Sequence, residues 1–157
     1  MPKSQQTGDS LLLEILDQGY DRKAWHGPNL RQSLRGVSAQ VAAWRPGEKR
    51  HNIWEIAVHA AYWKYRVRRR LRGDKPGSFT LAGSNWFQRP VELSEKAWRA
   101  DLALLEAEHR RLRQALVDYL AGKTRKVPAK VIFGIAFHDV YHAGQIRLLR
   151  RLQAGKK

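Results

Sequence analysis

Residues 51–71 read HNIWEIAVHAAYWKYRVRRRL, and their periodicity indicates the fold class. Apolar residues recur in this stretch at intervals of three or four positions, which predicts one amphipathic helix. They are Ile53, Ile56, Ala60, Trp63, Val67 and Leu71. The turn-forming sequence Gly-Asp-Lys-Pro-Gly at residues 73–77 ends this helix.

Three more long helices are expected around it. They span residues 10–20, 94–122 and 129–153. Ser10 and Ser94 are N-cap candidates for the first two of these, and Gly122 ends the second. Short helical pieces are expected near residues 30–34 and 38–44, and a loop at residues 78–90. The sequence therefore predicts an all-α four-helix bundle that forms a single domain over residues 10–153, preceded by a flexible tail at residues 1–9.

The composition fits one globular domain with a strongly basic surface. The chain has 157 residues, of which 43% are hydrophobic, enough to fill a core at this size. Lys and Arg number 30 against 14 Asp and Glu, so the net charge is +16. Such a surface attracts anions such as nucleic acid, phosphorylated metabolites or acidic lipid headgroups. The absence of cysteine excludes disulfides, a Cys-ligated zinc or iron–sulfur site and a cysteine nucleophile.

No segment of the sequence is apolar enough to span a membrane. The longest apolar run, residues 131–137, is far shorter than the roughly 20 residues that a spanning helix needs. The first nine residues are polar, and Glu14 interrupts the leucines that follow, which argues against a signal peptide. We therefore expect a cytoplasmic protein.

His138 and His142 stand out among the six histidines. They lie four residues apart on the last helix, so both rings project from one face, one turn apart. They also occupy consecutive positions of its apolar stripe, where Leu or Ile is the usual residue. Burying two imidazoles without partners costs on the order of a few kcal/mol. Hydrogen bonds inside the bundle would meet this need, but a shared divalent metal ion satisfies both rings at once, and we favour the metal.

The periodicity leaves the third ligand open between His59 and His109. His59 borders the apolar stripe of residues 51–71, whereas His109 falls in the apolar seam of the third long helix. His51 lies eight residues before His59, roughly 12 Å along the helix axis, so these two cannot bind one ion. His26 lies in a Gly/Pro-containing segment and is expected to be structural.

Three segments carry a family resemblance. Residues 51–63 read HNIWEIAVHAAYW, residues 137–146 read FHDVYHAGQI, and residues 25–30 read WHGPNL. They resemble, in this order, the signature helix, the closing helix and an early segment of the DinB-like (YfiT-like) superfamily of metal-dependent enzymes. The similarity extends from about residue 20 to residue 152, and the two histidine motifs together are fairly specific.

The resemblance implies a four-helix bundle in which His59, His138 and His142 hold a divalent ion, which favours His59 over His109. Zinc and nickel are the ions associated with such sites. Three neutral ligands leave the ion open to water or substrate, as in catalytic rather than structural sites. Some relatives are thiol-dependent S-transferases or isomerases that use low-molecular-weight thiols, and others are thought to be hydrolases. Members often dimerise, so a homodimer is expected here; the unusually positive charge of this chain leaves its substrate open.

A histidine-held zinc ion lowers the pKa of a bound water to about 7, or holds a bound thiol as thiolate. The predicted activity is therefore that of a metal-dependent hydrolase or thiol transferase acting on a small, anionic or thiol-bearing molecule. Asp139, Tyr141 and Gln145 lie near the ligands on the last helix, and Glu55 lies one turn before His59. We expect Asp139, Tyr141 and Glu55 to be catalytic residues that orient the ligands or move protons.

The basic residues suggest an alternative function. Residues 64–72 carry six positive charges, and further clusters lie at residues 123–130 and 147–157. The alternative is a basic helical-bundle protein that binds nucleic acid or another polyanion, with a structural histidine cluster. We favour the enzyme, because the first cluster spreads widely around its helix and no zinc finger, RNA-recognition aromatic motif or basic zipper accompanies it.

Overall fold

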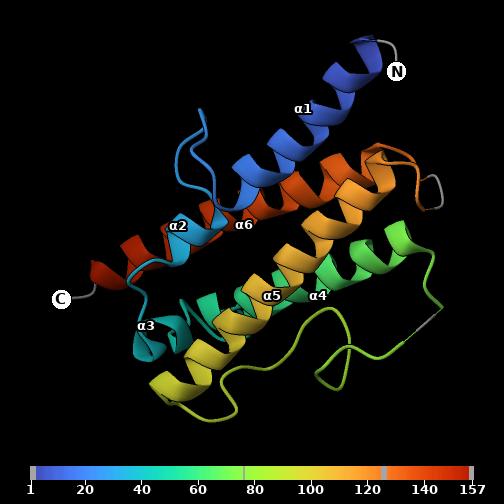
Figure 1. The fold of residues 1–157 in the computed structure, drawn as a ribbon. Helices are drawn as coiled ribbons and strands as arrows, with labels where there is room; N and C mark the ends of the chain where they lie inside the picture. Colours follow the sequence, from blue (N-terminus) through green and yellow to red (C-terminus); the bar gives the residue numbers. More distant parts are fainter. Residues whose placement is uncertain (1–2, 76, 125–126, 156–157) are drawn as a thin grey trace.

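The computed structural model describes residues 3–75, 77–124 and 127–155, and the regular structure in them is entirely helical. The helices are α1 (Lys3–Tyr20), α2 (Leu30–Leu34), α3 (Ala39–Ala43), α4 (Ile53–Arg72), α5 (Glu95–Leu120) and α6 (Lys130–Ala154). The predicted all-α fold is confirmed, with four long helices and two short helical pieces between the first two long ones (Figure 1).

Capping residues define the ends of the two central helices. The side chain of Asn52 accepts a hydrogen bond from the backbone N–H of Glu55 and caps α4, and Ser94 caps α5 in the same way through Ala97. Gly73 ends α4 with φ 71°, a left-handed conformation that glycine adopts without steric cost. Each of these ends lies within two residues of its predicted position.

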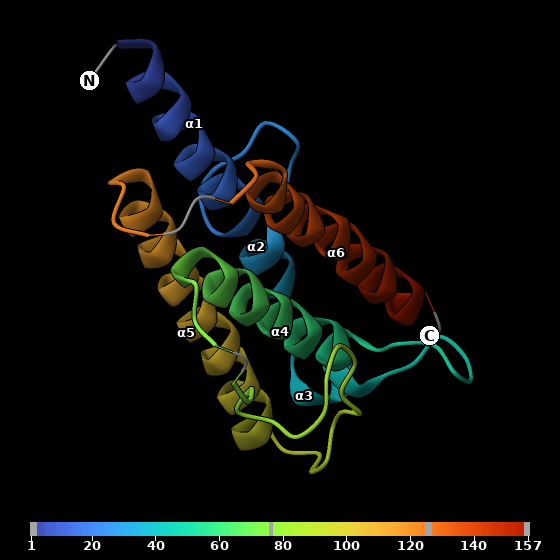
Figure 2. The ribbon, with the colours of Figure 1, turned by 90° about the vertical axis from the view of Figure 1, so that its right-hand side faces the viewer.

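The long helices are arranged in two parallel pairs. Both views show α4 and α5 running in one direction and α1 and α6 in the other (Figures 1 and 2). Two adjacent parallel helices cannot be joined by a tight turn, so the chain crosses from the end of α4 back to the start of α5 through residues 73–75 and 77–94. This crossover contains the predicted loop at residues 78–90. Its backbone lies beside α4, where its polar groups can bond to side chains of that helix.

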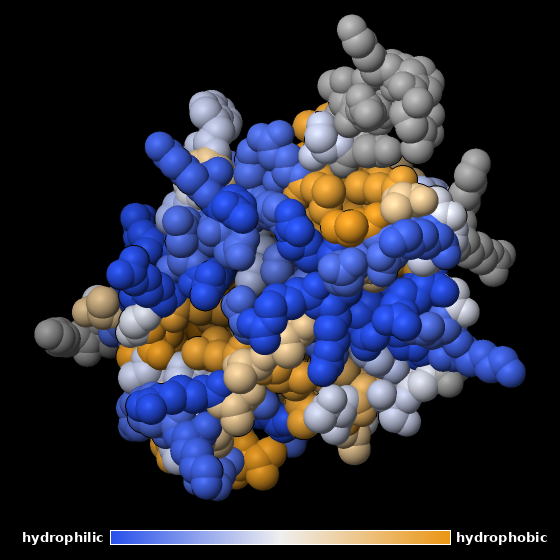
Figure 3. Space-filling view, viewed as in Figure 1, coloured by the Kyte–Doolittle hydropathy of each residue, from blue (hydrophilic) through white to orange (hydrophobic). Residues whose placement is uncertain are grey.

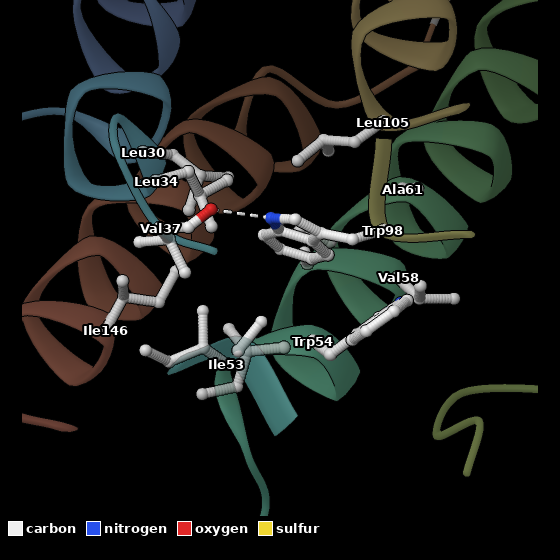
Figure 4. Close-up of a cluster of buried hydrophobic side chains, with 14 of the residues drawn as sticks. Leu30, Leu34, Val37, Ile53, Trp54, Val58, Ala61, Trp98, Leu105 and Ile146 are labelled. Atoms are coloured by element: carbon white, nitrogen blue, oxygen red, sulfur yellow. Dashed lines mark hydrogen bonds between the residues drawn. The ribbon is translucent and has the colours of Figure 1, made fainter. Parts of the chain in front are cut away.

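The core lies where α4 packs between α5 and α6. Trp54 and Trp98 are fully buried there at a centroid distance of 5.1 Å, and the indole of Trp98 donates a hydrogen bond of 2.7 Å to the carbonyl of Val37 (Figure 4). This bond fixes the segment between α2 and α3 against α5. Burying the polar end of an indole requires such a partner.

Helix α1 begins earlier than predicted. It starts at Lys3 rather than Ser10, so residues 3–9 are helical and do not form the expected tail; residues 1–2 lie outside the described residues. Residues 3–9 contain Lys and Gln, which are good helix formers, and they contain no proline. A Cβ added at Gly8 would meet no atom within 4 Å, so these turns extend beyond the packed bundle, as Figure 1 shows.

The surface facing the viewer in Figures 1 and 3 is mainly hydrophilic, with apolar side chains between the charged ones. A cavity of about 560 Å³ opens between α1, α2 and α5, where Leu34 and Leu105 meet Arg31 and Glu106. The histidines predicted to bind metal do not line it. Within the described residues, no helix has the length and apolarity that crossing a membrane requires.

Candidate metal centre

Three histidine side chains converge between α4 and α6. The Nε2 atom of His138 lies 3.1 Å from the Nε2 of His59 and 3.1 Å from the Nε2 of His142. Two nitrogens bound at about 2.0–2.1 Å to one tetrahedral zinc ion would lie about 3.4 Å apart. The cluster therefore has the ligand type and nearly the spacing of one metal-binding site.

The tautomer of His59 is set by the crossover loop. Its Nδ1 lies 2.8 Å from the backbone carbonyl oxygen of Asn85. A carbonyl oxygen can only accept, so Nδ1 carries the proton and Nε2 presents a lone pair. Asn85 has φ 62°, and its side-chain oxygen accepts a hydrogen bond from the indole of Trp63. The loop conformation thus leaves the Nε2 lone pair of His59 free to face the histidine cluster.

The tautomer of His142 is set within α6. Its Nδ1 lies 2.6 Å from the side-chain oxygen of Gln145, whose amide nitrogen donates a hydrogen bond of 3.0 Å to the hydroxyl of Tyr141. This chain assigns the amide oxygen to the histidine, so Nδ1 donates and Nε2 again presents a lone pair. Gln145 therefore orients His142, as expected for a residue that supports a metal ligand.

All three rings are neutral at neutral pH. Burial lowers the pKa of His59, lowers that of His142 to about 4, and, with the charge of His142 as a secondary cause, lowers that of His138 to about 3. His138 can donate at most one Nε2 proton to its two neighbours, so the Nε2 lone pair of at least one of them has no hydrogen-bond donor within the cluster. A divalent cation accepts such lone pairs, and a neutral imidazole is the form that binds it.

Aromatic rings enclose the centre. The indole of Trp86 stacks on His59 with centroids 3.8 Å apart and on His51 with centroids 3.6 Å apart. Trp63 meets the rings of His59 and His138 edge-on, each at 6.3 Å. The two indoles therefore cover part of the cluster with apolar surface.

Two buried phenylalanines and Arg89 hold the crossover loop against α4 and α5. Phe79 and Phe87 pack against Tyr62 of α4 at centroid distances of 5.5 and 5.6 Å. The Arg89 carbonyl accepts a hydrogen bond of 2.8 Å from Asn52, and its guanidinium pairs with Asp101 of α5. The position of Asn85 is therefore determined by contacts on both sides of it.

The three expected catalytic residues, Tyr141, Asp139 and Glu55, lie at different distances from the histidine cluster and differ in burial. Tyr141 is exposed and adjoins His142, with ring centroids 5.2 Å apart. Asp139 is fully buried on another face of α6 and forms an ion pair with Lys64, which is also fully buried. Burial raises the pKa of Asp139 and lowers that of Lys64, while their mutual attraction opposes both shifts. Lys64 therefore does not belong to the basic surface with which the sequence grouped it.

Glu55 is directed away from the histidine cluster. Its carboxylate accepts hydrogen bonds from both terminal nitrogens of Arg45, at 2.9 and 2.5 Å, and from the backbone N–H of Arg89. It also lies 3.0 Å from Nδ1 of His51. These hydrogen bonds lower the pKa of Glu55 against the opposing effect of burial. Glu55 reaches the metal centre only indirectly, through His51 and Trp86. A catalytic role for it stays a prediction.

His109, the rival third ligand, lies elsewhere in the bundle. Its ring is buried and stacks on Tyr20 at 3.8 Å, with the carboxylates of Asp17 and Asp21 nearby. Neither ring nitrogen has a hydrogen-bond partner among the described residues. The structure thus brings His59, and not His109, to His138 and His142.

Asn85 and Lys64 are the site residues that the sequence did not reveal. The Gly-Ser-Asn-Trp sequence at residues 83–86 signals a turn, because glycine and asparagine tolerate left-handed backbone, but it does not say what the turn approaches. Lys64 sits within a run of arginines, so its burial has no local signal.

Together these features define an all-helical bundle with a cluster of largely buried histidines suited to a divalent metal ion. The sequence profile of the DinB superfamily matches residues 23–146. The chain belongs to the DinB superfamily. No curated protein and no solved structure matches the chain.

Proposed function

We propose that this chain is a metal-dependent enzyme in which His59, His138 and His142 hold one divalent cation, zinc or nickel. The observation that carries the proposal is the meeting of three neutral Nε2 atoms, two of them with fixed lone pairs. When bound, such an ion supplies a nucleophile at neutral pH, either a water of lowered pKa or a thiol held as thiolate. Hydrolysis or thiol transfer on a small molecule is the chemistry that this centre supports best.

The protein's own groups orient the ligands and supply a proton donor. Asn85 and Gln145 hold His59 and His142 with Nε2 toward the centre. The hydroxyl of Tyr141 accepts from Gln145 and, within the described residues, donates to no acceptor. We assign it the role of proton donor to a substrate or leaving group beside His142.

The two remaining predicted residues act through others. We propose that Asp139 and Lys64 fix α6 against α4 beneath His138, since each neutralises the other in the core. Glu55 is proposed to hold His51 against Trp86, which in turn covers His59. Both are positioning roles, because neither carboxylate contacts the histidine cluster in the structure.

The test is the metal content of the purified chain after incubation with zinc or nickel. We expect about one ion per chain in the wild type and a loss of most of it in His59→Ala, His138→Ala and His142→Ala. His26→Ala is the matched control, because His26 is exposed and its ring contributes to no cluster. Equal metal content in all four variants, or none in the wild type, would contradict the proposal.

Polyanion binding is the second candidate function, favoured by the net charge of +16 and by the arginines of α4. It predicts binding of duplex DNA that weakens steeply as salt increases and is unaffected by a chelator. The metal-dependent enzyme instead predicts no tight DNA binding and a bound ion that the chelator removes. DNA binding and metal content, each measured with and without EDTA at two salt concentrations, separate the two functions.

A further inference from the structure

A groove continues from the metal centre along the contact between α4 and α6. It has a volume of about 330 Å³, and Trp63, Arg66, Val67 and Arg70 of α4 and Val131 of α6 are among the residues that line it. Trp63 lines the groove and also contacts the rings of His59 and His138 in the metal centre. The groove and the metal centre are therefore neighbouring compartments of one surface.

The geometry of α6 keeps the groove open toward the histidines. Gly134 follows Val131 by three residues and precedes His138 by four, so it lies on the helical face that joins them. A Cβ added at Gly134 would meet no atom within 4 Å. No side chain of α6 therefore fills the space between the groove and the cluster at this position.

The charge of the groove is positive and only partly compensated. The guanidinium of Arg70 has no hydrogen bond or ion pair with any described residue, and the guanidinium of Arg66 donates only to the neutral hydroxyl of Tyr62, at 3.2 Å. The one carboxylate in the lining, Asp74, pairs with Arg72 at 3.4 Å. Arg69, the third arginine of the lining, donates to the backbone carbonyls of Asp74 and Gly77 and to the hydroxyl of Tyr65. Arg66 and Arg70 are therefore the two lining arginines whose guanidinium groups bond to neither a carboxylate nor a backbone carbonyl in the described part of the chain.

We propose that Arg66 and Arg70 bind the anionic end of a small-molecule substrate whose reacting group lies at the histidine centre. This inference rests on the proposed metal-dependent function and adds the substrate class, an organic anion with a carboxylate or phosphate group. The planar guanidinium donates paired hydrogen bonds to either group. Trp63 supplies an apolar wall for the part of the substrate that connects the two ends.

The helix sets the length of that connecting part. Arg70 follows Trp63 by seven residues, about 10 Å along the axis, and helical side chains lean back toward the N-terminus. An anion attached directly to the reacting group is too short to bridge the two compartments. An anion separated from it by several methylene groups reaches.

The probes are thiols that differ only at the far end, added to the cobalt-loaded protein, where a thiolate–cobalt absorption band reports binding at the centre. We compare 6-mercaptohexanoate and 6-mercaptohexyl phosphate with neutral 6-mercaptohexanol, and mercaptoacetate serves as the short anion. One or both of the long anions should bind the wild type about three- to tenfold more tightly than the alcohol. Whichever anion gains more identifies carboxylate or phosphate as the preferred group, and mercaptoacetate should gain little.

The variants locate the effect. Arg66→Gln and Arg70→Gln should lose most of the advantage of the long anions and leave the affinity for 6-mercaptohexanol unchanged. Arg99→Gln is the matched control, because Arg99 is an exposed arginine of α5 without a described partner and should keep the advantage. Cobalt content is measured in every sample, so a protein that binds no cobalt overturns the metal function and this inference together.

Two other outcomes overturn the inference alone. If cobalt binds but the long anions and the alcohol have equal affinity, the groove does not recognise anions. If the anion advantage is equally reduced in Arg99→Gln, and duplex DNA binds with a steep salt dependence, the arginines form a general polyanion surface instead.

Discussion

At the scale of single residues, Asn85 acts through its backbone. Its carbonyl oxygen accepts the hydrogen bond from His59 Nδ1, and its φ of 62° aims that oxygen at the ring. Left-handed backbone costs roughly 1–2 kcal/mol for most residues, less for asparagine and nothing for glycine. The identity of residue 85 therefore controls how well His59, the proposed ligand on α4, is oriented.

This argument predicts that the substitution that removes the whole side chain of Asn85 has the smaller effect on zinc affinity. Asn85→Gly removes the whole side chain but retains the backbone conformation, so zinc affinity should stay within about threefold of the wild type. Asn85→Val forces a β-branched residue into left-handed backbone and should lower zinc affinity about tenfold or more. Competition with a fluorescent zinc chelator measures both. If the glycine variant loses as much affinity as the valine variant, the side-chain bond to Trp63 matters more than the carbonyl.

His109 is the second residue whose environment has a measurable consequence. Burial, reinforced by the charges of Lys64 and Arg113, lowers its pKa to about 2. In the unfolded chain a histidine has a pKa near 6.5. Above about pH 6.5 the ring is neutral in both states, and below it only the unfolded chain takes up the proton. The free energy of unfolding therefore falls as the pH decreases below about 6.5.

We expect His109→Phe to reduce this acid sensitivity. Phenylalanine keeps the stacking on Tyr20 and has no proton to bind. Between pH 7 and pH 5 the wild type should lose about 2 kcal/mol more stability than the variant. Urea unfolding with EDTA present measures this without a contribution from metal release, and His26→Phe, at an exposed position, should behave as the wild type. Equal losses in wild type and His109→Phe would show that His109 is accessible to protons in the folded state.

At the scale of elements, one glycine sets the approach of α1 to α6. A Cβ at Gly19 would lie 2.9 Å from the carbonyl oxygen of Ala136, which is backbone and cannot turn aside. Gly144 of α6 is the opposite case, because a Cβ there would meet nothing within 4 Å. The two glycines share helical backbone and differ only in their surroundings.

Replacing each by alanine separates packing from helix propensity. Gly144→Ala should stabilise the protein by about 0.5–1 kcal/mol, the usual gain for alanine over glycine within a helix. Gly19→Ala gains the same propensity but must displace α1 from α6, so it should be net destabilising by about 1–2 kcal/mol. Chemical denaturation measures both values. A stabilised Gly19→Ala variant would mean that α1 moves freely on α6.

The helices themselves could be predicted from the sequence because their signals are local. Asn52, Ser94 and Gly73 mark helix ends through hydrogen bonds and backbone angles within a few residues. The start of α1 has no such signal, and its predicted cap, Ser10, lies inside the helix. The burial of Asp139 could not be predicted, since its partner Lys64 is 75 positions away on another helix. Features such as this burial depend on which helices pack together, and the local sequence does not show that.

The candidate metal centre likewise contains residues that the sequence could predict and residues that it could not. His138 and His142 are recognisable because their spacing is helical and local. Periodicity alone could not choose between His59 and His109, and the resemblance to the DinB-like superfamily favoured His59, which the structure places beside the pair. Asn85 and Trp86 lie on the crossover loop and contact His59. The path of this loop follows from the parallel directions of α4 and α5 rather than from its own residues, so their contact with His59 could not be predicted.

At the scale of the whole molecule, the candidate ion adds a link between elements that packing, the Lys64–Asp139 ion pair and hydrogen bonds of the crossover loop also hold together. His59 lies on α4, His138 and His142 lie on α6, and the crossover loop contacts His59. A ligand that binds only the folded state stabilises it by an amount that grows with its concentration relative to Kd. At 100 times Kd the gain is about 2.7 kcal/mol, which raises Tm by about 5–10 °C for a domain of this size.

We therefore expect zinc to raise the Tm of the EDTA-treated, dialysed protein by about this amount, and magnesium to leave it unchanged, because magnesium prefers oxygen ligands. His142→Ala should lose more than half of the shift, since two imidazoles bind far more weakly than three. His26→Ala should retain the full shift, because its exposed ring is not part of the cluster. Thermal unfolding followed by circular dichroism measures each case. A shift of equal size in His142→Ala would place the stabilising ion elsewhere, and the unpartnered His109 beside Asp17 and Asp21 is where the next substitution would be made.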